Sequence, residues 1–157
     1  MYRDELRYVL STLARLGAPA GEVEDLCHEV FMAAFRKRGD FDPSRPVRPW
    51  LFGIAYRLML NVKRKGTTSG TDEALPHLSD PSRGPEELMQ RKQAGSVLSH
   101  AIGTLEPQRR AVFLLHDLDG QSAPLISDAL EIPLNTVYSR LRLARADLAR
   151  TIGSLPT

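Results

Sequence analysis

Apolar residues at helical spacing predict two helices with a tight turn between them over residues 120–150. Ser122 is a good N-cap, because its hydroxyl can accept a hydrogen bond from a free backbone N–H, and Pro124 then falls in the first turn, where its missing N–H is harmless. Pro133 disfavours the α conformation at the residue before it, so it ends the first helix and can open the second. The inward stripe of the second helix recurs at steps of three and four residues: Val137, Leu141, Ala144 and Leu148.

The opposite side of this second helix is polar and carries several arginines. A short helix, a turn and a longer helix of this kind are typical of a helix-turn-helix, whose second helix enters the DNA major groove with its N-terminal half. The same pattern also fits two ordinary helices of an all-α protein with a solvated outer face. The side chains that could contact base edges or phosphates are Asn135, Thr136, Ser139, Arg140, Arg142 and Arg145.

Two further helices are predicted near the N-terminus, over 4–16 and about 20–37. The second is acidic in its early part and basic at its end, which suits the helix dipole and equally suits a charged surface for a partner protein. His28 has no second ligand at metal-binding spacing, so no metal site is expected there. The apolar residues of this helix are expected on one broad face: Val23, Leu26, Cys27, Val30, Phe31, Ala34 and Phe35.

A strongly basic helix with interleaved aromatic residues is predicted over 46–66, after a loop at 39–46 in which Phe41 packs against the helices on either side. Basic residues with exposed aromatic rings suit single-stranded DNA, because the cations follow the phosphates and the rings stack on bases. The alternative interpretation is that the aromatic side chains are mostly core. We expect at least one of three to be core: Trp50, Phe52 and Tyr56.

The predicted architecture is all-α, with two small helical domains at 1–65 and 91–157, the second ending in the helix-turn-helix. Residues 66–86 lack helical periodicity and are rich in Gly, Thr, Ser, Asp and Pro, so the segment 66–90 is predicted to be a flexible linker. A helix is predicted to resume near Pro85 and to run to about Ile102. The first segment has 12 basic and 8 acidic residues, the linker 1 and 5, and the last segment 8 and 6. Two positive segments around a negative one suit two nucleic-acid-facing modules and an acidic tether.

Several classes of protein are disfavoured by what the chain lacks. Cys27 is the single cysteine, so neither an internal disulfide nor a cysteine zinc cluster can form. No apolar run approaches the ~20 residues of a membrane span. The N-terminus lacks the organisation of a signal peptide, since the charged residues Arg3, Asp4, Glu5 and Arg7 come close after Met1. We therefore expect a cytoplasmic protein with no membrane insertion, no metal and no other cofactor.

Four segments in this order resemble the extracytoplasmic-function (ECF) sigma factors, the small two-domain members of the bacterial sigma family. They are EDLCHEVFMAAFRK, FDPSRPVRPWLFGIAYRLML, LEPQRRAVFLLHDLDGQS and EIPLNTVYSRLRLARADL. The resemblance covers nearly the whole chain, about Tyr8 to Ile152. It implies a promoter-specificity subunit of RNA polymerase, which is not an enzyme itself.

The resemblance also implies partners for the N-terminal half. The second helix would dock on the coiled-coil of the polymerase β′ subunit through Glu24, Asp25, His28 and Glu29. The basic helix would capture and melt the non-template strand at the minus-ten element, and the loop 39–47 would form part of a pocket for a flipped base. The residues assigned to this element are Arg48, Trp50, Phe52, Tyr56, Arg57, Asn61, Lys63 and Arg64.

For the C-terminal half the resemblance implies contact with the polymerase β flap and with the minus-thirty-five element of the promoter. Tyr138 and Leu143 stand where basic residues are frequent in the family, and our hypothesis is that they contact thymine methyl groups. Members of the family are commonly held inactive by an anti-sigma factor, so one is expected here. The residues assigned to the upstream element are Asn135, Thr136, Tyr138, Ser139, Arg140, Arg142 and Arg145.

Two other classes of function were weighed against the sigma factor. One is a conventional helix-turn-helix transcription regulator with an N-terminal protein-interaction domain. The basic aromatic helix at 46–65 disfavours it, because a double-strand binder has no need of such a helix. The other is a nucleic-acid-processing enzyme. Its carboxylates would be Asp40, Asp42, Asp72 and Asp80, which lie in predicted loops without a metal-ligand pattern or a nucleophile–base pair.

Overall fold

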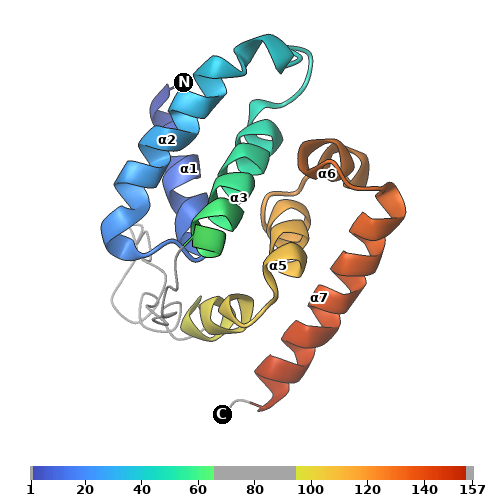
Figure 1. Ribbon diagram of the computed structural model, residues 1–157. Helices are drawn as coiled ribbons and strands as arrows, with labels where there is room; N and C mark the ends of the chain where they lie inside the picture. The colour runs from blue at the N-terminus through green and yellow to red at the C-terminus, as the bar shows by residue number, and fades with distance from the viewer. Residues whose placement is uncertain (1, 66–94, 155–157) are drawn as a thin grey trace, which may run out of the picture.

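The computed structural model describes residues 2–65 and 95–154, and these residues form helices and connecting turns without a strand (Figure 1). The predicted all-α class is therefore confirmed. The predicted linker at 66–90 lies outside the described residues. The helices are α1 (Tyr2–Arg15), α2 (Val23–Arg36), α3 (Val47–Lys65), a helical stretch at 95–103, α5 (Pro107–Phe113), α6 (Ala123–Leu130) and α7 (Leu134–Ser154).

Helices α1, α2 and α3 pack side by side as a three-helix unit (Figure 1). The apolar face of α1 supplies Val9 and Leu13, and α2 supplies Val30, all of which are buried. Gly17 adopts a positive φ of 98° just beyond α1, a backbone conformation that glycine reaches without the penalty other residues carry, and so it ends that helix as predicted.

Two helix starts differ slightly from the predicted ones at about 20 and at 46. The predicted helix at 20–37 begins with a 3₁₀ turn, η1 (Ala20–Glu22), before α2. Helix α3 begins at Val47, two residues ahead of Pro49. Proline is tolerated there because the first N–H groups of a helix have no intrahelical acceptor.

The C-terminal unit is built on α5 and α7, which pack against each other, with α6 beyond them (Figure 1). Between α5 and α6 the chain widens into a π-helical turn, η3 (Leu114–Leu118). The buried Arg110 guanidinium donates to the carbonyl oxygens of Gly103 (2.7 Å) and Leu105 (3.1 Å). These two hydrogen bonds give partners to carbonyl oxygens at the end of the helical stretch 95–103. Burial lowers the pKa of Arg110.

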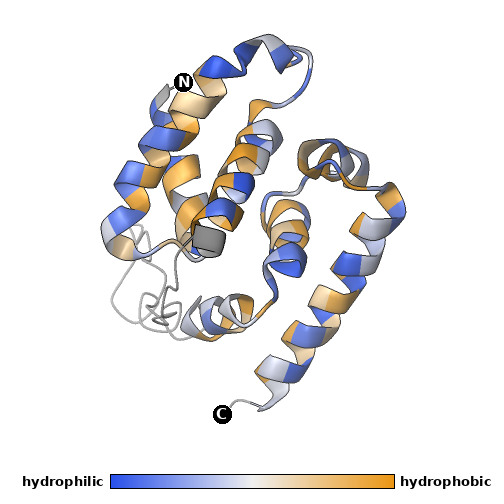
Figure 2. Ribbon diagram, in the orientation of Figure 1, coloured by the Kyte–Doolittle hydropathy of each residue, from blue (hydrophilic) through white to orange (hydrophobic). Residues whose placement is uncertain are grey.

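The turn between α6 and α7 has the features that the sequence predicts. The Ser122 hydroxyl accepts from the Leu125 N–H at 3.4 Å, which confirms the N-cap. Helix α6 ends at Leu130, and the next residue, Glu131, adopts a left-handed conformation with φ 57°. Hydrophilic and hydrophobic residues alternate along α7 (Figure 2). Its predicted inward stripe is confirmed as buried: Val137, Leu141, Ala144 and Leu148.

Helix α3 is packed from two sides, which a single apolar stripe does not predict. One side meets α1 and α2, and the other meets α6 of the C-terminal unit. Gly53 lies at this second contact, where a Cβ atom would stand 2.5 Å from the carbonyl oxygen of Ala129. The two units therefore contact each other directly, and α3 of the three-helix unit packs against α6 of the C-terminal unit.

Candidate nucleic-acid interface

The outer face of α7 is open to solvent along the positions predicted to contact DNA. Asn135, Ser139 and Arg142 are exposed, and Tyr138 is 54% exposed. The remaining polar positions of this face, Thr136 and Arg140, are half-buried. The exposed apolar residues on this face are Leu134, Tyr138 and Leu143. The helix thus presents amide, hydroxyl and guanidinium groups together with apolar surface, which is the set of groups that reads base edges and thymine methyls.

Arg145 lies on the same helix but already has a partner in the described chain. Its Nη2 and Nε donate to the two carboxylate oxygens of Asp117 in η3, at 2.7 and 3.1 Å. This pair holds the pKa of Asp117 below its usual range, and His116 adds a further hydrogen bond at 2.7 Å. The two parallel bonds fix the orientation of the guanidinium. Arg145 would have to leave Asp117 before it could contact a phosphate.

The basic side chains at the start of α3 also have protein partners. Arg48 lies 3.3 Å from the Glu5 carboxylate and 5.1 Å from the centre of the Tyr8 ring. Arg57 Nη2 donates to the Ala129 carbonyl oxygen at 2.9 Å. Farther along α3, Asn61 is exposed, whereas the side chains of Lys63 and Arg64 lie outside the described residues.

Two of the three aromatic residues of α3 are core. Phe52 is 1% exposed and Tyr56 is 8% exposed, which confirms the prediction that at least one of the three aromatic residues is core. With their rings buried, neither residue can stack on a base as its assignment to the minus-ten element requires. The physical reason is that α3 has packed neighbours on both sides. Trp50 is half-buried, and its ring lies 4.9 Å from that of Phe41, which confirms the predicted packing of Phe41 for the α3 side.

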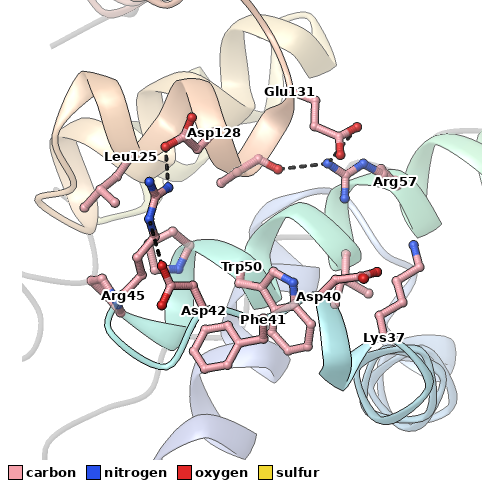
Figure 3. Close-up of a pocket in the computed structure, with 14 residues that line it drawn as sticks. Lys37, Asp40, Phe41, Asp42, Arg45, Trp50, Arg57, Leu125, Asp128 and Glu131 are labelled. Atoms are coloured by element: carbon pink, nitrogen blue, oxygen red, sulfur yellow. Dashed lines mark hydrogen bonds and ion pairs between the residues drawn. The ribbon is translucent and has the colours of Figure 1, made fainter.

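A cavity of about 340 Å³ lies between residues 37–46, the first half of α3 and helix α6 (Figure 3). Its apolar floor includes Phe41, Trp50 and Ile54. The size and mixed lining fall within the range of small-ligand sites. The charged side chains that line it are Lys37, Asp40, Asp42, Arg45, Arg57, Asp128 and Glu131.

The contribution of α6 to this cavity was missed by sequence reasoning. Leu125, Asp128, Ala129 and Glu131 line it from a helix far from α3 in the sequence. Their spacing is that of an ordinary amphipathic helix, so no signal in the sequence could have found them.

The predicted polymerase-binding residues share the solvent side of α2. Glu24, Asp25, His28 and Glu29 are all exposed, whereas Leu26, Cys27 and Val30 face the core. The prediction that Phe35 faces inward is wrong. Phe35 is 65% exposed, because it lies about 100° around α2 from the buried Ala34, on the same side as the exposed His28. The Arg38 guanidinium covers its ring at 4.1 Å.

Residues 2–65 and 95–154 contain neither a metal-binding group nor a membrane span. No three His, Cys, Asp or Glu side chains are gathered there in a way that could hold a metal ion. None of the helices in these ranges combines the length and the apolar character needed to cross a membrane.

Comparison with protein families identifies two regions of the chain. Residues 1–68 match the family described as Sigma-70 region 2. Residues 96–148 match the family described as Sigma-70, region 4. The first match covers α1 to α3, and the second covers the C-terminal unit through the inward stripe of α7.

Comparison with individual proteins also points to sigma factors. The chain is 33% identical over 141 residues to the ECF RNA polymerase sigma factor SigE of Mycolicibacterium smegmatis, covering 85% of this chain and 53% of that protein. It is 28% identical over 147 residues to the RNA polymerase sigma factor CnrH of Cupriavidus metallidurans, covering 88% of this chain and 77% of that one. The fold is similar to that of the sigma factor RpoE in complex with the anti-sigma factor NepR from Bartonella quintana. For that pair the TM-score is 0.71 and the identity 19%, with coverage of 99% of this chain and 98% of the other.

Proposed function

Because this chain belongs to the extracytoplasmic-function class of the sigma-70 family, which directs promoter-specific transcription, we propose a division of its two DNA contacts between α3 and α7. Helix α7 reads the upstream, minus-thirty-five element as duplex. Helix α3 and the cavity beside it hold the non-template strand of the minus-ten element. The observation that carries this proposal is that one chain has an exposed polar face on a helix-turn-helix and a separate set of arginines on α3.

In the upstream contact, the N-terminal half of α7 lies in the major groove. Arg142 is exposed and can donate two hydrogen bonds to guanine, the commonest specific contact of arginine. Asn135, Thr136 and Ser139 bind base edges or phosphates. Tyr138 supplies apolar contact with thymine methyl groups. A good bidentate contact of this kind discriminates against the wrong base by about 1–3 kcal/mol.

In the minus-ten contact, arginines of α3 follow the phosphates of the single strand while the cavity takes an extruded base. Arg57 lines the same cavity as the half-buried Trp50, whose ring is the remaining aromatic candidate for stacking, and Arg48 lies near the start of the helix. Lys63 and Arg64 extend the basic track along α3. Extrusion of a base costs a few kcal/mol of unstacking, which a preformed cavity and nearby cations offset.

The exposed acidic residues of α2 supply the contact with core RNA polymerase. Glu24, Asp25 and Glu29 lie on one solvent-facing side, and charge complementarity there directs docking on the β′ coiled-coil. The C-terminal unit contacts the β flap. In this role the chain positions the polymerase, catalyses no bond change itself, and works in the cytoplasm beside the polymerase. The complex of RpoE with NepR supports an anti-sigma factor as a further partner.

The test is transcription with purified bacterial core polymerase, this protein and a library of random upstream DNA. The proposal expects defined start sites that share two sequence blocks at a fixed spacing. Retention of duplex DNA by the protein alone, without initiation, would instead identify a conventional helix-turn-helix regulator.

A further inference from the structure

Helix α7 is tied to the rest of the C-terminal unit by two ion pairs. Arg145 of α7 pairs with Asp117 of η3, and its Nε and Nη2 donate to separate carboxylate oxygens at 3.1 and 2.7 Å. Asp147 of α7 pairs with Arg109 of α5, whose Nη1 donates to Asp147 Oδ2 at 2.5 Å. We refer to Arg145–Asp117 as the η3 pair and to Asp147–Arg109 as the α5 pair. Helix α7 contributes the cation to the first pair and the anion to the second.

The two pairs lie on opposite sides of the buried stripe of α7. An α-helix turns by about 100° per residue, so Arg145 falls to one side of the middle of that stripe and Asp147 to the other. Burial of apolar surface is non-directional, so the stripe selects the face of α7 that points inward without fixing its angle closely. Charged hydrogen bonds between arginine and carboxylate add geometric specificity. One pair on each side therefore opposes rotation of α7 in both senses.

The π-helical turn η3 supplies one of the two partners. The Asp119 N–H donates to the Leu114 carbonyl oxygen at 2.9 Å, five residues back, so this turn holds one residue more than an α-helical turn. Turns of this kind are rare and occur frequently at functional sites. The Asp117 side chain lies in this turn and is only 25% exposed, and His116 Nδ1 lies 2.7 Å from its Oδ1. The carboxylate that binds Arg145 is thus itself held in place.

The side chains proposed to read DNA lie on the outer side of α7. Asn135, Ser139 and Arg142 are exposed there. Side chains extend about 5–6 Å from the axis of a helix, so a rotation of about 20° would move their ends by about 2 Å. A shift of this size breaks a hydrogen bond, because donor and acceptor must lie within about 2.7–3.2 Å of each other. The angle of α7 about its own axis therefore decides which base contacts can form.

We propose that the η3 pair and the α5 pair fix the rotation of α7 about its axis, and that Arg145 is a positioning residue rather than a DNA contact. The proposal rests on the upstream-element role of α7 given above. Arg145 Nε and Nη2 are already bound, and the Asp117 carboxylate neutralises the guanidinium charge. Arg145 acts on DNA recognition through the side chains that it holds in place, such as Arg142. Recognition of the upstream element thus depends on Asp117, a carboxylate that does not touch DNA.

The test measures how well holoenzyme, assembled from core polymerase and the full-length protein, distinguishes two duplexes. One duplex carries the upstream block recovered in the transcription experiment above, and the other carries that block scrambled. Fluorescence anisotropy gives both affinities over a range of salt concentrations, at a temperature at which circular dichroism shows every variant to be folded. The ratio of the two affinities cancels the non-specific effect of a changed net charge. The variants are Asp117→Asn, Arg145→Gln, their combination, and Arg109→Gln.

Asp117→Asn should lower the affinity ratio by about fivefold or more, which is the lower end of what one good base contact contributes. Arg145→Gln should lower the ratio by the same factor and the double variant no further, because either change alone breaks the η3 pair. Arg109→Gln should lower the ratio through the α5 pair. The slope of log affinity against log salt concentration should be the same for Arg145→Gln and the wild type, because a side chain that binds no phosphate releases no counterion.

The opposite pattern identifies a phosphate contact. If Arg145 bound DNA, Asp117→Asn would free it and strengthen binding, and Arg145→Gln would reduce the steepness of the salt slope by about 0.9. Either result would overturn the proposal. An unchanged affinity ratio in Asp117→Asn or in Arg109→Gln would overturn it as well, and so would additive losses in the double variant.

A second measurement needs no DNA. In NMR spectra of the free full-length protein, the Nε–H of Arg145 should exchange with water more slowly than that of the exposed Arg142, and Asp117→Asn should remove this difference. Arg142→Gln is the matched control and should leave exchange at Arg145 unchanged. Equal exchange at the two arginines in the wild type would show that the η3 pair does not form in solution and would overturn the proposal.

The two measurements separate this proposal from the function on which it rests. If the wild type failed to initiate transcription with core polymerase, the proposed function would be refuted. Exchange at Arg145 would still decide whether the η3 pair forms. The protein alone would then replace holoenzyme in the duplex measurement, with a block selected from random duplex DNA, because a conventional helix-turn-helix regulator would also read DNA through α7.

Discussion

Replacing Tyr8 by Phe removes the one hydrogen bond that ties α1 to the turn before α6. The Tyr8 hydroxyl donates to Asp119 Oδ2 at 2.6 Å, and both side chains are half-buried. A hydrogen bond to a charged group contributes about 1.5–3 kcal/mol. Because water can reach part of this site, we expect Tyr8→Phe to lower the free energy of unfolding by about 1.5–2 kcal/mol at pH 7.

The decrease in the free energy of unfolding caused by Tyr8→Phe should depend on pH, and the surroundings of Asp119 determine the direction of that dependence. Burial raises the pKa of Asp119, while the bond from Tyr8 and the nearby Arg15 and Arg48 pull it down. Removing the hydroxyl therefore raises the folded-state pKa of Asp119 further. A carboxyl group with a raised folded pKa stabilises the fold only when protonated, and this contribution is lost as pH rises through that pKa. The cost of Tyr8→Phe should thus be full at pH 7 and shrink as pH falls toward about 4.

Urea denaturation followed by circular dichroism measures this cost across the pH range. Urea is preferred to guanidinium chloride, because chloride would screen Arg15 and Arg48. The exposed Tyr138 supplies the control, since Tyr138→Phe should leave the free energy of unfolding within about 0.5 kcal/mol of the wild type. A Tyr8→Phe cost below that value, or one that stays constant from pH 7 to pH 4, would refute the reasoning.

Three other substitutions test separate parts of the molecule. Arg142→Ala should weaken binding to the upstream element by about 1–3 kcal/mol in a promoter gel-shift with holoenzyme, and should leave core-polymerase binding unchanged. Glu29→Arg should weaken core-polymerase binding in a pull-down because it reverses an exposed charge on α2, and should leave the melting temperature of the protein unchanged. Ile126→Ala, in the core side of α6, should cost about 2–5 kcal/mol in urea denaturation because it leaves a cavity at a fully buried position. Equal effects of Arg142→Ala and Glu29→Arg at the same step would contradict the assignment of two sites.

The helix-turn-helix and the outward-facing sides of its second helix and of α2 could largely be predicted from the sequence. The helix-turn-helix followed from Ser122, Pro133 and the inward stripe of α7, because capping, proline and a period of 3.6 residues act over a few neighbouring residues. The acidic outer side of α2 followed for the same reason. These features need no information about distant parts of the chain, and the structure places each of them where local chemistry predicts.

Only the tertiary structure shows which aromatic side chains are buried and which are exposed. The sequence made Phe52 and Tyr56 candidates for base stacking. Both are buried, because α3 packs against α1 and α2 on one side and against α6 on the other. Phe35 was predicted to be a core residue, yet it is exposed, because it lies about 100° around α2 from the buried Ala34. The spacing of apolar residues identifies a helix, but it does not show how many other helices pack against it.

The contact between α3 and α6 was decided only by the tertiary structure. Gly53 and Ala129 are unremarkable in the sequence, and the acidic residues Asp128 and Glu131 look like an ordinary solvated face. Their meaning depends on which helix lies opposite, which is a property of two segments far apart in the chain. Local physical chemistry determined the helices and their ends, and long-range packing determined which of the arginines are exposed and which have partners within the protein.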